Sequence, residues 1–411
     1  MQPPSPPYHA PFNDLAGSDV HERQADFVLK VEQVYEPKRG LLVKLNADAG
    51  VLSLAHNFAW ITGGGRNHIF QATEEGSIYI DATRVVLITN NIEGHRLQLQ
   101  ELSGLDLEVL RHAHLFVQAV ATSIANGSSV QFDTDGSFDN ALAPLRQALT
   151  PLDIRRFRQL SHDCSSILSH VSRTHVRPGL SEWAIGAAIS QACVARGIDV
   201  VVLLVAADDR VDAIRHPLPT TNVLRHKAML VLCGRRGGLI ASLTRMVYFS
   251  QDTRIPDDLR KRHDAVTFVD AAALAATAAP LATAAPLATS GDVFRAIQAA
   301  YTSTGFANEW TLHHQGGGTG YKSREWKATP TSEVGAALDG IAPNKAFAWN
   351  PSIAGTKSED TVLLVEGGSR IEVLTADGDW PQVRHTMGGI TYSRPDVLDI
   401  QVDAAGNPLP K

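Results

Sequence analysis

The pattern of apolar residues changes at Thr150, and this change constrains the fold more than any other feature of the chain. Before Thr150, short β-branched runs, GLLVKLN, GVLSLA, GSIYIDA and RVVLITNN, alternate with segments of helical spacing, IEGHRLQLQEL and DNALAPLRQAL. After it come two helical segments and then longer apolar runs, among them VVVLLVA, KAMLVLCG, GLIASLTRMVYFS and DTVLLVEGG. A chain of 411 residues is too long for one ordinary core, so we expect two domains.

The junction between the two parts is the start of a helix. Thr150 is a typical N-cap and Pro151 suits the first helical position. A second helix is expected from Ser181 to Gly197. The longer runs that follow predict an α+β domain with mostly antiparallel strands. We expect a tail over residues 1–22, an α/β domain over 23–149, the α+β domain over 150–400 and a second tail over 401–411.

Composition excludes several classes of partner. The net charge of -6 gives no basic field for nucleic acid or anionic lipid. No apolar run approaches the ~20 residues that span a bilayer. Three widely spaced cysteines indicate reduced thiols, and the Pro-rich start lacks the apolar segment of a signal peptide. We expect a cytoplasmic protein with no nucleic-acid partner and no membrane partner.

One segment, ATAAPLATAAPLATSGDV, is low in complexity and contains a tandem repeat. Its alanines favour a helix, but Pro280 and Pro286 interrupt the helical pattern. We expect a surface connection here, placed before the helical segment DVFRAIQAAYTSTG.

Two adjacent histidines precede three glycines in the stretch LHHQGGGTGYKSREW. This pattern is typical of a catalytic loop. The stretch follows RPGLSEWAIG, IRHPLP and GLIASLTR, and precedes AFAWNPSIAGTKSEDTVLL. This order resembles the creatinase / aminopeptidase P / methionine aminopeptidase family over about residues 40–378. The resemblance implies a small creatinase-like α/β domain, then a pita-bread domain whose curved sheet is mostly antiparallel. It also implies a peptidase-like hydrolase that acts on C–N bonds.

The metal ligands of that family are largely replaced in this chain. In its metal-dependent members two aspartates, one histidine and two glutamates hold a pair of divalent ions. Val231 and Ser242 stand at the two aspartate positions. Gly317 stands at the histidine and Asn350 at the first glutamate, and only Glu359 matches. Because two such ions need several anionic oxygen ligands, we predict no metal and no other cofactor. An alternative metal site remains open, formed by His216, His313, His314 and Cys233.

The remaining polar residues supply candidates for chemistry. His216 matches a family histidine beside the leaving group, and imidazole suits proton transfer near neutral pH. Glu359 is expected to orient water or substrate, and His314 is preferred over His313 because the pair would alternate in an extended chain. Arg245 could clamp a substrate anion, the alternative being an ion pair with Glu359 or Asp360. The other substrate-binding candidates are Asn350, Lys357, Gln315, Ser242, Arg324 and Glu325.

A dimer is also implied by the resemblance. In creatinase and aminopeptidase P a loop of one subunit's small domain covers the other subunit's cavity. The matching segment here is FAWITGGGRNHIF, in which Trp60 could form an apolar wall and Arg66 and His68 could reach a polar substrate. The alternative is a glycine-rich hairpin with a solvated arginine. We expect a homodimer.

The leading hypothesis is a metal-independent hydrolase of a C–N bond in a small amino-acid-like, amide, amidino or dipeptide-like substrate. Creatinase shows that this fold can work without metal, although it keeps the loop histidine that is Gly317 here. Two alternatives stay open. One is a catalytically inactive protein that binds a ligand or peptide, and the other is an Xaa-Pro-type metallopeptidase with an unusual metal site.

Overall fold

The structure is a computed structural model that describes residues 17–69, 74–113, 116–251, 254–282, 288–330, 340–403 and 409. It divides into two compact units. One contains residues up to Arg156 together with Arg236–Leu239, and the other contains Phe157–Arg235 and Ile240–Lys411. None of the helices in the described ranges is both long and apolar enough to cross a membrane.

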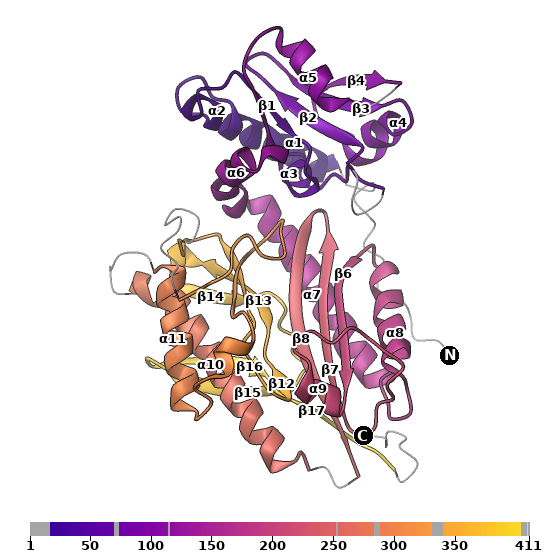
Figure 1. Ribbon diagram of the computed structural model, residues 1–411, viewed down its shortest axis with the longest axis vertical. Helices are drawn as coiled ribbons and strands as arrows, with labels where there is room; N and C mark the ends of the chain where they lie inside the picture. The colour runs from indigo at the N-terminus through magenta and orange to yellow at the C-terminus, as the bar shows by residue number, and fades with distance from the viewer. Residues whose placement is uncertain are drawn as a thin grey trace. The chain divides into compact units, whose positions relative to one another are not determined.

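The N-terminal unit is built on a five-stranded sheet of order β4-β3-β2-β1-β5 (Figure 1). Strands β1, β2 and β3 pair antiparallel, whereas β4 and β5 join the two sides of this group in parallel. The strands are β1 (Ala49–Leu52), β2 (Gly76–Ile80), β3 (Val85–Asn90), β4 (Glu108–His112) and β5 (Val130–Phe132). The main helices are α1 (Gly17–Val34), α3 (Ala55–Ile61), α5 (Val117–Ala125) and α6 (Ser137–Gln147).

Two features of this unit differ from the sequence prediction. Residues 17–22, assigned above to a tail, form the first turns of α1, while residues 1–16 lie outside the described ranges. The run GLLVKLN, expected as a strand, contains the short helix α2 (Leu41–Lys44). The Lys44 amide donates to Gly40 O at 3.3 Å and the Leu45 amide to Leu41 O at 3.1 Å, which is the hydrogen-bond pattern of a helical turn and not of a strand.

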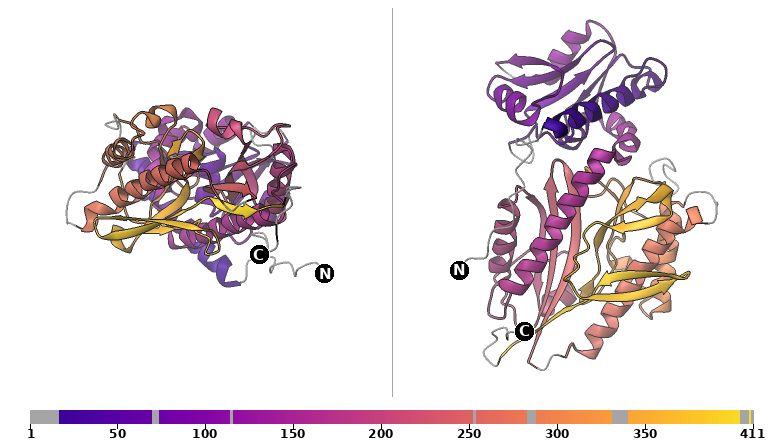
Figure 2. Two further views of the ribbon diagram at one scale, coloured as in Figure 1. Left: turned by 90° about the horizontal axis from the view of Figure 1, so that it is seen from below. Right: turned by 180° about the vertical axis from the view of Figure 1, so that it is seen from behind.

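The C-terminal unit begins with helix α7 (Pro151–Thr174), which starts inside the other unit, and α8 (Glu182–Val194). Both predicted caps are confirmed, because the Asp153 amide donates to Thr150 Oγ1 at 3.2 Å and the Ala184 amide donates to Ser181 Oγ at 3.2 Å. The two helices cover one face of a sheet of order β17-β8-β7-β6 (Figures 1 and 2). Its strands are β6 (Asp199–Ala207), β7 (Lys227–Arg236), β8 (Leu239–Ser250) and β17 (Leu398–Gln401).

A second sheet in this unit, of order β14-β13-β10-β9, is antiparallel throughout. Its strands are β9 (Gly316–Thr319), β10 (Ala346–Trp349), β13 (Asp360–Val365) and β14 (Arg370–Val373). Helices α10 (Asp257–Ala282) and α11 (Ser290–Ser303) pack on each other, and their apolar faces form one core with Phe347, Trp349 and Val362. Two short ribbons, β11–β12 (Ser352–Ile353, Thr356–Lys357) and β15–β16 (Gln382–Met387, Ile390–Pro395), flank α10. The predicted α+β class with mostly antiparallel strands is confirmed.

The low-complexity segment is only partly a connection. Helix α10 continues through Pro280 to Ala282, and residues 283–287, which include Pro286, lie outside the described ranges. The tertiary core that buries Leu274 and Ala278 offsets the local cost of a proline in the last turn. Helix α11 then opens with a capping box between Thr289 and Asp292.

Candidate active site

Three imidazoles converge in the C-terminal unit. His216 follows helix α9 (Asp209–Ala213), and His313 and His314 lie between the 3₁₀ helix Glu309–Leu312 and β9. The Nε2 atoms of His216 and His313 are 2.9 Å apart. The rings of His313 and His314 stack with centroids 4.6 Å apart, and His314 also lies 5.8 Å from the ring of His216. The expectation that only one of the two neighbours faces the site is therefore wrong, because the rings of both His313 and His314 lie against the ring of His216.

The environment keeps these imidazoles uncharged. Burial, reinforced by the charge of Lys357, lowers the pKa of His313 to about 2. Burial together with Arg324 and Lys327 lowers the pKa of His314 to about 3. The pKa of His216 is lowered as well, by burial and then by Lys357. At neutral pH the contact between His216 and His313 is therefore one neutral N–H donating to one neutral lone pair.

Glu359 lies at the centre of an ion-pair triad that we call the Lys357–Glu359–Arg324 triad. Lys357 Nζ is 2.8 Å from Glu359 Oε2, and Arg324 Nη2 donates to Oε1 at 2.9 Å. The hydroxyl of Thr244, on β8, also donates to Oε2, at 2.8 Å. Burial alone would raise the pKa of Glu359, but Lys357 and Arg324 hold this pKa well below its usual range. The carboxylate stays ionised, and both of its oxygens are engaged.

The segment after β9 brings Arg324 to this triad. The Glu325 amide donates to Gly318 O at 2.8 Å and the Ala328 amide to Gly316 O at 2.9 Å, so the chain folds back over the glycine run. A Cβ atom on Gly317 would lie 2.0 Å from the Trp326 carbonyl oxygen. The glycines therefore form a strand that allows close backbone contact.

Arg245 does not reach this site. Its Nη2 atom donates to Asp360 Oδ1 at 3.0 Å and to Thr375 O at 2.8 Å, and its side chain is buried. Adjacent residues on a strand point to opposite faces, so Arg245 faces away from Thr244, which contacts Glu359. The structure corrects the expected anion clamp in favour of the alternative, an ion pair with Asp360.

Three further candidates are buried polar groups. Gln315 accepts from Tyr301 Oη and donates to the Trp310 and His313 carbonyl oxygens, so its amide holds the backbone in place and is not available to substrate. The hydroxyl of Ser242 donates to Cys233 Sγ at 3.2 Å. Asn350 is 2 % exposed, and its Oδ1 atom has no hydrogen-bond partner among the described residues.

The candidates in the N-terminal unit fall into two groups. Trp60 is fully buried in α3, so it offers no apolar wall to another subunit, which corrects that expectation. Arg66 is exposed with its Nε atom 3.3 Å from Glu101 Oε1, and His68 forms an isolated β-bridge with Glu74. The roles of Arg66 and His68 stay predictions.

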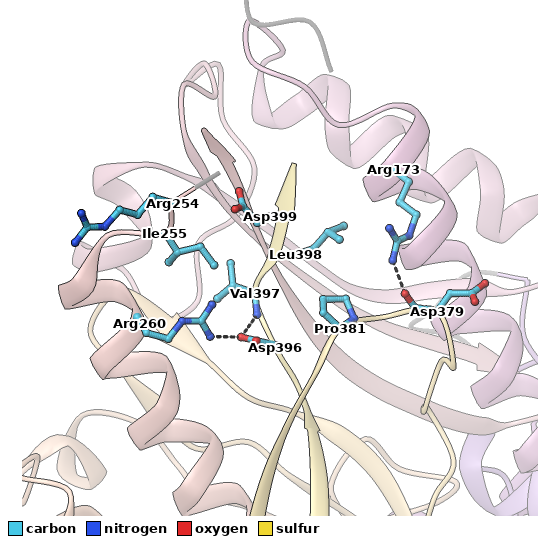
Figure 3. Close-up of a pocket in the computed structure, with 10 residues that line it drawn as sticks. All are labelled: Arg173, Arg254, Ile255, Arg260, Asp379, Pro381, Asp396, Val397, Leu398 and Asp399. Carbon is cyan, nitrogen blue, oxygen red and sulfur yellow. Dashed lines mark hydrogen bonds and ion pairs between the residues drawn. The ribbon is translucent and has the colours of Figure 1, made fainter. Parts of the chain in front are cut away.

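Two pockets in the C-terminal unit lie away from the histidines. The larger, of about 530 Å³, lies where α7 ends and α10 begins (Figure 3), and it is lined by Arg173, Arg254, Ile255, Arg260, Asp379, Pro381, Asp396, Val397, Leu398 and Asp399. Arg173 donates there to Asp379 O and Arg260 to Asp396 Oδ1. The smaller, of about 290 Å³, contains Arg245 and Asp360. These charged groups are already paired within the fold.

Similarity to known proteins is decisive for the family. The model of Metallopeptidase family M24 matches residues 155–375, more than half of the chain. The chain belongs to the metallopeptidase family M24. No curated protein matches it in sequence.

Solved structures show the same two-domain creatinase-like fold. The chain is similar to an Xaa-Pro dipeptidase from Bacillus anthracis, with a TM-score of 0.64 and 16% identity over 93% of this chain and 100% of that one. It is similar to the dipeptidase PepE from Mycobacterium ulcerans, with a TM-score of 0.66 and 15% identity over 93% and 99%. The N-terminal domain of the FACT complex subunit SPT16 from Cicer arietinum (chickpea) also matches, with a TM-score of 0.60 and 10% identity over 88% and 97%. The predicted resemblance and fold class are confirmed, and the fold is that of peptidase-type hydrolases.

The dinuclear metal centre of M24 enzymes does not fit the residues of this chain. Val231 is buried in an apolar cluster with Leu204, Met229 and Met246, and its own side chain offers no ligand atom to an ion. A histidine at position 317 would collide with the Trp326 backbone. Lys357 and Arg324 already occupy the one matching carboxylate. Two ions need several anionic oxygens, and this site supplies one carboxylate together with several cations.

Three of the four residues expected to form an alternative metal site lie together. His216, His313 and His314 place one ring nitrogen each within 4.8 Å of one another, a spacing that a single ion could bridge. Cys233 is not part of this group, since its sulfur accepts from Ser242. The positive charges that lower the pKa values of these histidines oppose a dication at the same place.

Sequence reasoning missed two members of the site. Thr244 forms an isolated bridge with Glu359, and strand alternation could have placed it on the site face. Lys327 is exposed and is one of the cations that act on His216 and His314. Its only signal is its position three residues after Arg324.

Proposed function

We propose that this M24 protein hydrolyses a C–N bond in a small amide or amino-acid-like compound without the family's dinuclear metal. The observation that carries this proposal is the 2.9 Å contact between His216 and His313. It supplies an oriented, neutral base that is exposed on the His216 side and feels the charges of Lys357 and Arg324. Creatinase provides the precedent of principle for metal-free chemistry on this fold.

In the proposed reaction His216 acts as the proton shuttle. When its Nε2–H group donates to His313, the Nδ1 atom of His216 carries a lone pair. Nδ1 takes a proton from water as the water oxygen attacks the carbonyl carbon, and the tetrahedral oxyanion forms. The imidazolium then returns this proton to the amine nitrogen as the C–N bond breaks. A low pKa of His216 favours this second step, because it makes the imidazolium a stronger acid.

The cations of the triad have a supporting role in this scheme. Lys357 and Arg324 supply positive charge near the developing oxyanion, and Glu359 holds both side chains in place. Glu359 thus acts by orienting groups and not by exchanging protons, because its pKa is held well below the usual range by Lys357 and Arg324 against the effect of burial. His314 stacks on His313 and fixes the plane of that ring.

The test is a search for turnover with chelator-treated protein. Small amides, N-acyl amino acids and amidino compounds serve as substrates, and liberated amine is measured. Turnover that persists after chelation and is lost in His216→Gln supports the proposal. Turnover that requires added metal contradicts it and returns the Xaa-Pro-type metallopeptidase to consideration.

A catalytically inactive ligand- or peptide-binding protein is the second candidate. One observation favours it: both oxygens of Glu359 are engaged by side chains of the same protein. Ligand binding without any turnover in the screen would select this candidate.

The proposal also covers the compartment, the oligomeric state and the partners of the protein. It acts as a cytoplasmic homodimer on a small-molecule or dipeptide-like substrate, with neither nucleic acid nor membrane as a partner. The buried thiols of Cys164, Cys193 and Cys233 suit a reducing compartment. A monomer in sedimentation at micromolar concentration would remove Arg66 and His68 from the proposed site.

A further inference from the structure

We propose that the place where metal-dependent members of this fold hold cations binds an anionic group in this chain, a carboxylate or a phosphate carried by the ligand. The site would thus bind a negatively charged group in place of positively charged metal ions. It rests on the proposed function only where it names that ligand as the substrate, because the binding of an anion is measurable without turnover.

The balance of formal charge supports an anion. Arg324, Lys327 and Lys357 bring three positive charges to the histidine cluster, and Glu359 is the carboxylate that pairs with two of them. The three histidines are neutral near pH 7, so the group carries a net positive charge. Lys327 extends from the segment that covers β9 and is exposed, so its ammonium group is accessible to a ligand.

Unused hydrogen-bonding capacity at the same place is the second, independent observation. Arg324 donates through Nη1 to Ser323 O and through Nη2 to Glu359, but its buried Nε–H group has no hydrogen-bond partner among the described residues. The buried Nδ1 atom of His313 likewise has none. Buried polar atoms are rarely left unsatisfied, so these atoms indicate that a polar ligand or ordered water belongs here.

Asn350 adds an acceptor beside these donors. The register that pairs Trp349 with Asp360 puts Asn350 next to Glu359 on the neighbouring strand. Its Oδ1 atom is buried and unpartnered. An N-acyl amino acid offers both kinds of partner, an oxyanion for Arg324 and Lys327 and an amide N–H for Asn350. A guanidino or amidino group is disfavoured, because its positive charge would meet the three cations.

Isothermal titration calorimetry with the full chain tests the proposal through three probes. These are N-acetylglycine, its neutral counterpart N-acetylglycinamide, and inorganic phosphate. We expect N-acetylglycine to bind at least about tenfold more tightly than the amide, since hydrogen bonds to charged groups are the strong ones. Added salt should weaken the binding of the charged probe. Binding of phosphate in place of N-acetylglycine supports the same site and assigns the anion to a phosphate.

Lys327→Ala is the informative variant, because an exposed lysine can be removed without disturbing the core. We expect this substitution to weaken the binding of N-acetylglycine about three- to tenfold and to leave the binding of N-acetylglycinamide unchanged. Lys261→Ala, at an exposed lysine of α10, is the matched control and should have no effect. Arg324→Gln should weaken the binding of N-acetylglycine by more than tenfold. Circular dichroism of this variant checks that it still folds.

Two results would overturn the inference: equal affinity for N-acetylglycine and N-acetylglycinamide, or equal behaviour of Lys327→Ala and Lys261→Ala. Failure of the proposed function gives a different result. Anion binding without turnover of any compound removes the hydrolase and leaves the anion site. Turnover of neutral and anionic amides at equal rates keeps the hydrolase and removes the anion site.

Discussion

Lys357 places its ammonium nitrogen 2.8 Å from Glu359, the residue that is expected from the sequence to match a metal ligand of the family. Arg324 holds the other carboxylate oxygen at 2.9 Å. The single charge of Glu359 is thus shared by two cationic side chains of the same protein. This relationship explains how the carboxylate of Glu359 can stay ionised although it is buried.

The triad should behave as a coupled unit in stability measurements. Glu359→Gln leaves Lys357 buried without its partner and should lower the free energy of unfolding by about 3–5 kcal/mol. Lys357→Met should also destabilise the protein, while the double variant should lose less than the sum of the two. Urea unfolding of the four proteins measures the coupling. Strict additivity would show that the pair is not energetically linked.

Gly317 should tolerate no side chain. Gly317→Ala puts a Cβ atom 2.0 Å from the Trp326 carbonyl oxygen, so the segment over β9 must move, and we expect a loss of about 1–3 kcal/mol in unfolding free energy. Gly378→Ala is the matched control, since a Cβ there meets nothing within 4 Å. Equal stability of the two variants would mean that the backbone over Gly317 is not packed as described.

His216 should carry the proton transfer. Once a substrate is identified, His216→Gln should lower the rate by roughly 10²–10⁴, the usual range for a general acid or base. The fold should persist, because His216 is exposed and outside the core. Initial rates and thermal unfolding of the variant are measured together. A wild-type rate in His216→Gln would transfer the role to His314.

Acid should destabilise the protein through His313. Burial and nearby positive charge keep the pKa of His313 at about 2, below the ordinary value of an unfolded histidine. As pH falls from 7 to 5, the unfolded chain takes up the proton first, so folding stability falls. This single group should account for a loss of about 2 kcal/mol over that interval. Urea titrations at pH 7, 6 and 5 should therefore show a smaller loss in His313→Gln, and an equal loss in both proteins would contradict the assignment.

The fold could be predicted because its signals are local or lie in the order of segments. Thr150 and Ser181 are helix caps in the structure as in the sequence, and the apolar runs from Asp199 onward became the predicted strands. Helix α2 could not be predicted in this way. A run of seven apolar and polar residues fits both periods, and the backbone hydrogen bonds from Lys44 to Gly40 and from Leu45 to Leu41, which show the helix, have no signal in the sequence.

The site was less predictable, for two different physical reasons. The direction of Arg245 follows from strand alternation once Thr244 is placed on the site face, so that information was present in the sequence. The position of Arg324 depends on the backbone of residues 324–328 closing over Gly316 and Gly318. Such a long-range contact has no local sequence signature, and neither does the stacking of His314 on His313.

The metal content of the purified protein tests the central claim most directly. Protein prepared without chelators is analysed for Mn, Co, Zn and Fe, and its thermal unfolding is compared with and without a chelator. The account predicts no stoichiometric metal and an unchanged unfolding temperature, because Val231, Gly317 and Asn350 supply no anionic oxygen and Glu359 is held by Lys357 and Arg324. About two ions per chain, or one ion lost on replacement of His313, would contradict it.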